Sequence, residues 1–368
     1  MGLACANGSA TAIIDGTFEV LDIFQGSMAP AILIDRLQKR YGAVTAVQDV
    51  SFQVEPGELF GILGPNGAGK TTTLRCLCTL SRPDSGRVEV DGIPVWENPR
   101  SARRCLGYVA QEVALDKVLT GRELLRLQAS LYHLPNAQAK TRIDAVLALL
   151  DLQTWADKLS GTYSGGIRKR FDLAAGLLHQ PKVLVLDEPT VGLDIESRSV
   201  IWQFLRELRQ QGITVLLTSH YLEEVDALAD RVAIIDHGRV IALGTPSELK
   251  DQVGGDRITL RIREFTPAAE AQQAQAILEN LPVVEEVIIN TVQGNSLNLV
   301  VKPQSNALSL VQNTLQEKGF PLFSLAQARP SLDDVYLAAT GQTLLDADLA
   351  GSASRDLKAE KKQAMRSN

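Results

Sequence analysis

One stretch constrains the fold of this chain more than any other: Gly64-Pro65-Asn66-Gly67-Ala68-Gly69-Lys70-Thr71-Thr72, called here the phosphate loop. An apolar run at residues 59–63 precedes it and is typical of a buried strand, and a helical segment over residues 71–80 follows it. Glycines let successive backbone N–H groups turn inward around a polyphosphate, which also lies at the positive end of the following helix. Lys70 supplies a positive charge for the terminal phosphates, and the Thr71 hydroxyl is placed to hold Mg²⁺. The strand and helix argue against a glycine-rich turn that matches by accident, so the stretch predicts a nucleoside triphosphate site.

The remainder of the chain is predicted to form an α/β domain around this loop and a smaller unit after it. Apolar runs at residues 182–186 and 213–218 are typical of parallel strands covered on both faces. Apolar residues at helical spacing predict a helical subdomain over about residues 120–180. Gly254-Gly255 marks the expected end of a first domain covering 29–255. The order β-α-β-β-α-β predicts a ferredoxin-like α+β domain over 256–340.

Both ends of the chain are predicted to be disordered. Residues 1–28 contain no Lys or Arg, so the basic region of a signal peptide is missing, and Met28 is an alternative start. Residues 341–368 form a polar tail rich in Lys, Asp and Ser.

Composition limits the possible partners. The net charge of −6 gives no electrostatic case for nucleic acid. No stretch approaches the roughly 18 consecutive apolar residues of a spanning helix, so a membrane process would require another subunit to cross the bilayer. The four cysteines form no metal-binding pattern and are expected to be reduced thiols.

A second chemical signal is the acidic pair Asp187-Glu188 at the end of an apolar run. Mg²⁺ needs hard oxygen ligands, and Asp187 is placed to supply one at the carboxyl end of a strand. Glu188 follows directly and is a candidate base for the water that attacks the phosphate. The alternative, that these are two solvated acids in a turn before Pro189 without a chemical role, is poor in a chain that also carries the phosphate loop.

A third motif brings in a family resemblance. Tyr163-Ser164-Gly165-Gly166-Ile167-Arg168-Lys169-Arg170 resembles the signature loop of ATP-binding cassette (ABC) transporter ATPases, and the phosphate loop and acidic pair fall where that family has them. The family more often has Leu at the first position and Gln at the fifth; Tyr followed by basic residues resembles its daunorubicin-type drug-resistance exporters. Physically, Ser164 and the following N–H groups form a second anion-binding helix start. The resemblance implies a head-to-tail dimer in which each signature closes over the other subunit's phosphate loop.

The resemblance also implies roles for single residues. Tyr41 would stack on adenine, although alone it would be an ordinary turn tyrosine; Gln111 would touch Mg²⁺ and sense the membrane partner. His220 would contact the γ-phosphate, although a lone His is usually structural. Gly192-Leu193-Asp194 would cross the dimer interface, with Ile195 in place of a common Pro. The implied site contains the catalytic residues Lys70, Glu188 and His220, the metal ligands Thr71, Gln111 and Asp187, and the nucleotide contacts Tyr41, Gly64, Pro65, Asn66, Gly67, Ala68, Gly69, Lys70, Thr71, Thr72, Gln111, Ser164, Gly165, Gly166 and Asp194.

The resemblance implies an ATP- and Mg²⁺-dependent ATPase subunit at the cytoplasmic face of the membrane. As a homodimer or heterodimer it would drive export of a hydrophobic or amphipathic compound through a separate multi-span permease. Residues 330–336 resemble the closing motif of the same exporter branch, and the second domain is expected to serve assembly or regulation. An importer ATPase would share every catalytic residue. A soluble ABC-type ATPase in translation or DNA maintenance is a further alternative, which the single phosphate loop and the lack of a heptad run disfavour.

Overall fold

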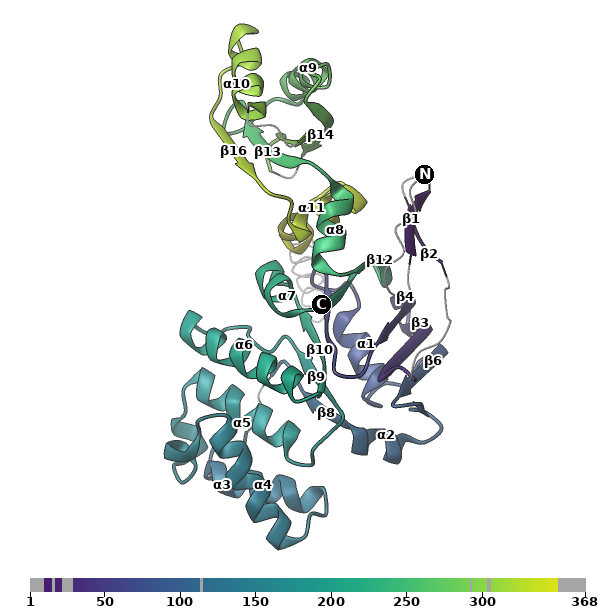
Figure 1. The fold of residues 1–368 in the computed structure, drawn as a ribbon, viewed down its shortest axis with the longest axis vertical. Coiled ribbons are helices and arrows are strands. Elements are labelled where there is room, and N and C mark those ends of the chain that lie inside the picture. The colour runs from purple at the N-terminus through teal and green to yellow at the C-terminus, as the bar shows by residue number, and fades with distance from the viewer. Residues whose placement is uncertain are drawn as a thin grey trace, which may run out of the picture. The chain divides into compact units, whose positions relative to one another are not determined.

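The computed structural model describes residues 10–14, 17–21, 29–112, 115–291, 293–302 and 306–349. The chain forms two compact units, with Leu243 the last residue of the first and Gly244 opening the main part of the second (Figure 1). The predicted boundary between the two domains lies near Gly255 instead. The difference arises because helix α8 (Pro246–Val253), with Leu249 buried, packs against the later helix α11 (Leu332–Thr340).

The first unit is organised by a ten-stranded sheet in the order β7-β6-β3-β4-β12-β11-β5-β10-β9-β8. Its parallel half consists of β8 (Leu106–Val109), β9 (Val183–Asp187), β10 (Thr214–Ser219), β5 (Leu59–Leu63) and β11 (Arg231–Asp236). Every residue of β5, β9 and β10 is buried, which accounts for their continuous apolar sequences. The register pairs Thr218 with Asp187 and Ser219 with Leu63, so the carboxyl ends of these three strands meet at one edge.

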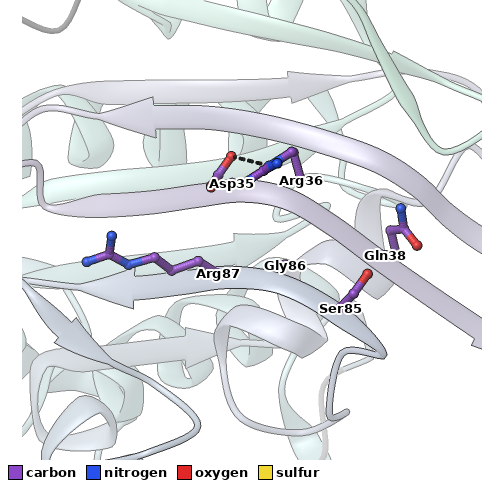
Figure 2. Close-up of a pocket in the computed structure, with 6 residues that line it drawn as sticks. All are labelled: Asp35, Arg36, Gln38, Ser85, Gly86 and Arg87. Carbon is purple, nitrogen blue, oxygen red and sulfur yellow. Dashed lines mark ion pairs between the residues drawn. The ribbon is translucent and has the colours of Figure 1, made fainter.

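The other half of the sheet contains β3 (Ile32–Tyr41), β4 (Val44–Val54), β6 (Ser85–Val90), β7 (Ile93–Pro94) and β12 (Arg239–Gly244). The β3–β4, β3–β6 and β6–β7 pairs are antiparallel, and β3 is irregular between Asp35 and Gln38. Figure 2 shows the surface hollow at this irregularity, lined by Asp35, Arg36, Gln38, Ser85, Gly86 and Arg87. Its arginines are paired, Arg36 with Asp35 at 3.4 Å and Arg87 with Glu89 at 2.6 Å, so the hollow offers no free cation for a phosphate.

Four helices accompany the sheet: α1 (Lys70–Leu77), α2 (Pro99–Cys105), α6 (Ile195–Gln210) and α7 (Leu222–Leu228). Three more form the helical subdomain, a group of their own in Figure 1: α3 (Gly121–Leu131), α4 (Asn136–Leu149) and α5 (Gly165–Leu177). Short 3-10 turns at Gln153–Trp155 and Ser160–Thr162 lead into α5. Among the described residues, no helix has the length and apolar character needed to cross a bilayer.

The helical subdomain is tied to the sheet by His179, which follows α5. Its ring stacks on Tyr132 with centroids 3.9 Å apart, and its Nε2 lies 2.9 Å from the Leu106 carbonyl oxygen of β8. Burial lowers the pKa of His179, a bond to Leu106 opposes this effect, and Arg142 adds to it. The neutral imidazole is therefore the form that fits this contact.

The second unit contains β13 (Asp256–Arg261), α9 (Ala268–Leu278), β14 (Val284–Asn290), β15 (Ser296–Val301), α10 (Ala307–Glu317) and β16 (Ser324–Ala328), besides α8 and α11. Its antiparallel sheet has the order β14-β15-β13-β16. Fourteen buried residues, contributed mostly by this sheet and by α9 and α10, form its own core. The predicted architecture, an α/β domain with a helical subdomain followed by a ferredoxin-like α+β domain, is confirmed.

The two chain ends differ from the expected disorder. β1 (Ala10–Ile14) and β2 (Thr17–Leu21), rich in β-branched and aromatic residues, pair in a two-stranded sheet; the other residues of 1–28 lie outside the described part. At the other end, residues 344–349 are helical and Leu344 is buried. The Thr343 hydroxyl donates to Asp346, which also accepts from Asn290 Nδ2 at 2.7 Å. Residues 341–349 are therefore not part of a disordered tail, and residues 350–368 lie outside the described part.

Cys76 and Cys78 are buried and Cys105 is half-buried, all as free thiols; Cys5 lies outside the described part. Burial raises the pKa of Cys76 to about 11, which keeps it protonated. These three cysteines are therefore core residues, as expected.

Candidate active site

The phosphate loop connects β5 to α1, and its backbone requires glycine at three positions. Gly64, Gly67 and Gly69 have φ values of +155°, +92° and +111°. A Cβ atom on Gly64 would lie 2.1 Å from the Ile235 carbonyl oxygen, and one on Gly69 would lie 2.6 Å from the Ala46 carbonyl oxygen. Neither contact leaves room for a side chain, so the loop can take this path only with these glycines.

Lys70 is the first residue of α1, and its ammonium group is held inside the loop. Its Nζ donates to the carbonyl oxygens of Gly64 at 2.5 Å and Pro65 at 3.1 Å. The same Nζ lies 3.8 Å from Glu188 Oε1, and both side chains are almost fully buried. A cation fixed at the start of a helix, where the first N–H groups have no partner within the helix, is suited to bind phosphate oxygens.

Asp187, the last residue of β9, accepts two hydroxyl hydrogen bonds on one oxygen. Thr71 Oγ1 donates to Asp187 Oδ1 at 3.1 Å and Thr218 Oγ1 donates to it at 2.7 Å. The described residues contain no metal-binding cluster of three or more His, Cys, Asp or Glu side chains. One carboxylate beside one hydroxyl at a phosphate loop nevertheless fits Mg²⁺, which takes few protein ligands and completes its shell with phosphate and water oxygens.

Thr218 is a site residue that sequence reasoning missed. Besides donating to Asp187, its Oγ1 accepts from the backbone N–H of Glu188 at 3.0 Å. This one hydroxyl therefore fixes both members of the acidic pair. The available signal was a threonine at the end of a fully buried strand, but its partner depends on β10 lying next to β9.

Glu188 lies at the centre of the site, with a left-handed backbone at φ +47°. Gln111 Nε2 donates to its Oε2 at 2.9 Å, and His220 Nδ1 lies 3.3 Å from its Oε1. Burial acts to raise the pKa of Glu188, but His220 and Lys70 outweigh burial, and the net pKa is lowered. Glu188 is therefore a carboxylate at neutral pH and can accept a proton.

Ser164 begins α5 in the helical subdomain, where its Oγ accepts from the N–H of Ile167 at 3.3 Å. The preceding Tyr163, where the family more often has Leu, is buried and stacks on Phe171 with centroids 4.9 Å apart. Gly166 packs so closely on α6 that a Cβ atom would lie 2.3 Å from Ser197 Oγ. Lys169, one turn further along α5, is buried and donates to the Ala110 carbonyl oxygen at 2.8 Å, next to Gln111.

The structure therefore joins the side chains of six predicted residues through short contacts: Lys70, Thr71, Gln111, Asp187, Glu188 and His220. Two other predicted residues, Tyr41 and Asp194, have different local partners. The Tyr41 ring is 45% exposed, and its Oη lies 2.9 Å from Ser81 Oγ. Asp194 caps the start of α6 by accepting from the N–H of Ser197 at 2.7 Å.

Comparison with known proteins decides the family. The chain is 45% identical over 311 residues to the daunorubicin resistance ATP-binding protein DrrA3 of Streptomyces coeruleorubidus, covering 84% of this chain and 96% of that protein. The chain is an ATP-binding protein of the ABC transporter family. The family model for ABC transporters matches residues 47–191, and the model for the C-terminal domain of DrrA1-3-like ATP-binding proteins matches residues 244–340.

Two further similarities agree with this assignment. The chain, whose residues 29–243 are called the cassette from here on, is 35% identical over 312 residues to the linearmycin resistance ATP-binding protein LnrL of Bacillus subtilis, covering 85% of this chain and 99% of that protein. A dimeric ATP-binding cassette with bound ADP and phosphate superposes with a TM-score of 0.53 at 25% identity, covering 58% of this chain and 98% of that one. This ABC protein is therefore an ATPase that binds ATP.

Proposed function

We propose that this ABC ATPase drives export of a hydrophobic or amphipathic compound, drug-like or lipid-like, through a separate multi-span permease at the cytoplasmic face of the membrane. The relatives named for daunorubicin and linearmycin resistance support this cargo class. The observation that carries the proposal is the joining of Lys70, the Asp187-Glu188 pair and His220 at one strand edge. That arrangement contains the groups that phosphoryl transfer to water requires.

The proposed chemistry assigns a role to each group. Thr71 and Asp187 would hold Mg²⁺, with Gln111 beside them, and the bound ion would neutralise charge on the β- and γ-phosphates. Lys70 would bind the same phosphates, and Tyr41 would stack on the adenine ring. Glu188 would take a proton from the attacking water, since its lowered pKa keeps it ionised.

His220 and the signature would complete the site. His220 Nδ1 lies 3.3 Å from Glu188 Oε1, which supports a role for the imidazole in orienting this carboxylate, and the imidazole would also contact the γ-phosphate. Ser164 starts a helix in the helical subdomain, so its N–H groups would serve the nucleotide of a second subunit in a head-to-tail pair. Asp194, at the start of α6, would lie at that subunit interface.

The experiment that tests this function is Glu188→Gln. The amide keeps the shape of the side chain but cannot accept the proton, so we expect ATP binding to persist, hydrolysis to fall by at least about a hundredfold, and an ATP-dependent dimer to accumulate on size-exclusion chromatography. Glu223→Gln, an exposed glutamate on α7, is the matched control and should behave as wild type.

If Glu188→Gln retained ATP turnover, another residue would have to be the base. Export is tested separately, by ATP-dependent uptake of a fluorescent amphipathic compound into inverted vesicles that contain the permease. Uptake into right-side-out vesicles with ATP trapped inside would instead support an importer.

A further inference from the structure

His220 contacts two groups that come from different elements. Its Nδ1 lies 3.3 Å from Glu188, and its ring lies against Tyr221, with centroids 4.2 Å apart and planes tilted by 41°. Tyr221 is the N-cap of α7, a helix of only seven residues. The orientation of His220 toward Glu188 therefore depends on what holds the Tyr221 ring.

Arg198 of α6 holds that ring. Its guanidinium carbon lies 4.6 Å from the centre of the Tyr221 ring, within the range of a cation–π contact. Arg198 Nε is buried and has no hydrogen-bond partner among the described residues, so the ring face is a principal contact of this cation. The backbone N–H of Arg198 donates to the Asp194 carbonyl oxygen at 3.0 Å, which places Arg198 in the first turn of α6.

A second contact holds α7 against α6 one helical turn further on. Trp202 Nε1 donates to Glu224 Oε1 at 3.0 Å, and Glu224 is 0% exposed. Trp202 follows Arg198 by four residues and Glu224 follows Tyr221 by three, so each pair lies on one face of its helix. The two contacts fix the start of α7, and with it His220, relative to α6.

We propose that Arg198 and Tyr221 are positioning residues for ATP hydrolysis, because the cation–π contact holds the Tyr221 ring against His220 and so keeps the imidazole directed at Glu188. This inference rests on the proposed role of His220 and Glu188 in hydrolysis. Neither Arg198 nor Tyr221 is required to touch the nucleotide. Their loss should therefore lower kcat and leave ATP affinity unchanged.

The test compares Arg198→Met with Arg206→Met in steady-state ATPase assays. Methionine keeps an unbranched apolar side chain and removes the charge. Arg206 lies on the same helix and also contacts α7, through the Ala227 carbonyl oxygen at 3.5 Å, but further from His220. We expect Arg198→Met to lower kcat by about threefold to thirtyfold, the range set by a cation–π contact, with KM for ATP unchanged. Arg206→Met should keep the wild-type kcat.

Tyr221 variants separate positioning from folding. Tyr221→Phe keeps the ring and should retain the wild-type kcat, whereas Tyr221→Leu should lower kcat by as much as Arg198→Met does. The double variant Arg198→Met/Tyr221→Leu should be no slower than either single variant, because each substitution removes the same contact. Urea midpoints of Arg198→Met and Arg206→Met should agree.

Each outcome decides the proposal. A wild-type kcat in Arg198→Met, a rise in KM alone, additive losses in the double variant, or an equal loss in Arg206→Met would overturn it. Glu188→Gln and His220→Ala are measured alongside: if both retain turnover, the proposed roles of these two residues in hydrolysis fail, and the positioning role fails with them. If they lose turnover while Arg198→Met does not, only the positioning role fails.

Discussion

Thr218→Val is the substitution that most directly tests the geometry of the acidic pair. Valine has nearly the shape of threonine, so the change removes a hydroxyl without opening a cavity. The hydroxyl makes two buried hydrogen bonds, one to the Asp187 carboxylate at 2.7 Å and one from the Glu188 N–H at 3.0 Å. The variant therefore loses a charge-assisted bond and leaves a buried donor unsatisfied.

The expected cost follows from these two bonds. A hydrogen bond to a charged group contributes about 1.5 to 3 kcal/mol, and an orphaned buried donor costs about 1 to 3 kcal/mol, so the free energy of unfolding should fall by about 2.5 to 6 kcal/mol. Thr214→Val, at the other end of β10, is the matched control. Its hydroxyl accepts a single bond, from the partly buried Gly57 N–H at 2.9 Å, and its loss should cost about 1 kcal/mol.

The assay is urea unfolding followed by tryptophan fluorescence. All three tryptophans of the chain, at positions 96, 155 and 202, lie in the cassette, so the signal reports on this unit. At an m-value of about 3 kcal/mol per M, the midpoint of Thr218→Val should lie roughly 1 M below that of Thr214→Val. ATP turnover should also fall, by about tenfold or more, because the acidic pair loses its fixed orientation. Equal midpoints and wild-type turnover in Thr218→Val would refute this reasoning.

Three further predictions address other parts of the molecule. Gly64→Ala should abolish ATP binding, measured with a fluorescent ATP analogue, because its Cβ would lie 2.1 Å from a carbonyl oxygen; Gly92→Ala, in open space, is the control. Ser164→Arg should stop hydrolysis while ATP still binds, because the side chain blocks a helix start required by the partner subunit; wild-type turnover would argue against a composite site. His179→Gln should reduce the stability that the protein loses between about pH 7.5 and about pH 5.5. Burial lowers the pKa of His179, so the stabilising contribution of this residue is complete above its unfolded pKa of about 6.5 and is lost as the pH falls below that value. Urea midpoints at both pH values check this, and an unchanged difference would show that another group titrates.

The residues of the site could be predicted from sequence where chemistry is encoded locally. The phosphate loop follows an apolar strand and opens a helix, and the acidic pair ends another apolar strand, so each motif carries its own structural context. The predicted neighbours of Glu188, which are Lys70, Gln111 and His220, come from three distant segments. The role of Lys70 followed from the phosphate loop and those of Gln111 and His220 from the family resemblance; the structure adds the contacts of all three with Glu188, at 3.8, 2.9 and 3.3 Å.

Contacts that depend on strand order or on helix packing were missed. Thr218 contacts Asp187 because β10 lies between β5 and β9, and an apolar run does not reveal its neighbours in a sheet. Arg198 and Tyr221 meet because α6 packs on α7. In the sequence, Arg198 is only an arginine near the start of a helix, and Tyr221 is only a tyrosine after a histidine. Neither belongs to a periodic pattern that would indicate their contact.

The second unit shows how polar residues can extend a folded domain beyond its apolar pattern. Residues 341–349 look like a tail because acidic and polar residues interrupt them, and the boundary at Gly255 looks natural because two glycines break a helix. Both ends are instead fixed by α11: α8 packs against it, and the Leu344 N–H donates to Asp333 at 2.8 Å. Asp346, 1% exposed, is satisfied by Asn290 and Thr343, so its burial does not leave a charge without partners. Because α8 and residues 343–346 complete the packing around α11, the second unit has to include residues from 244 to at least 346 for its polar groups to be satisfied.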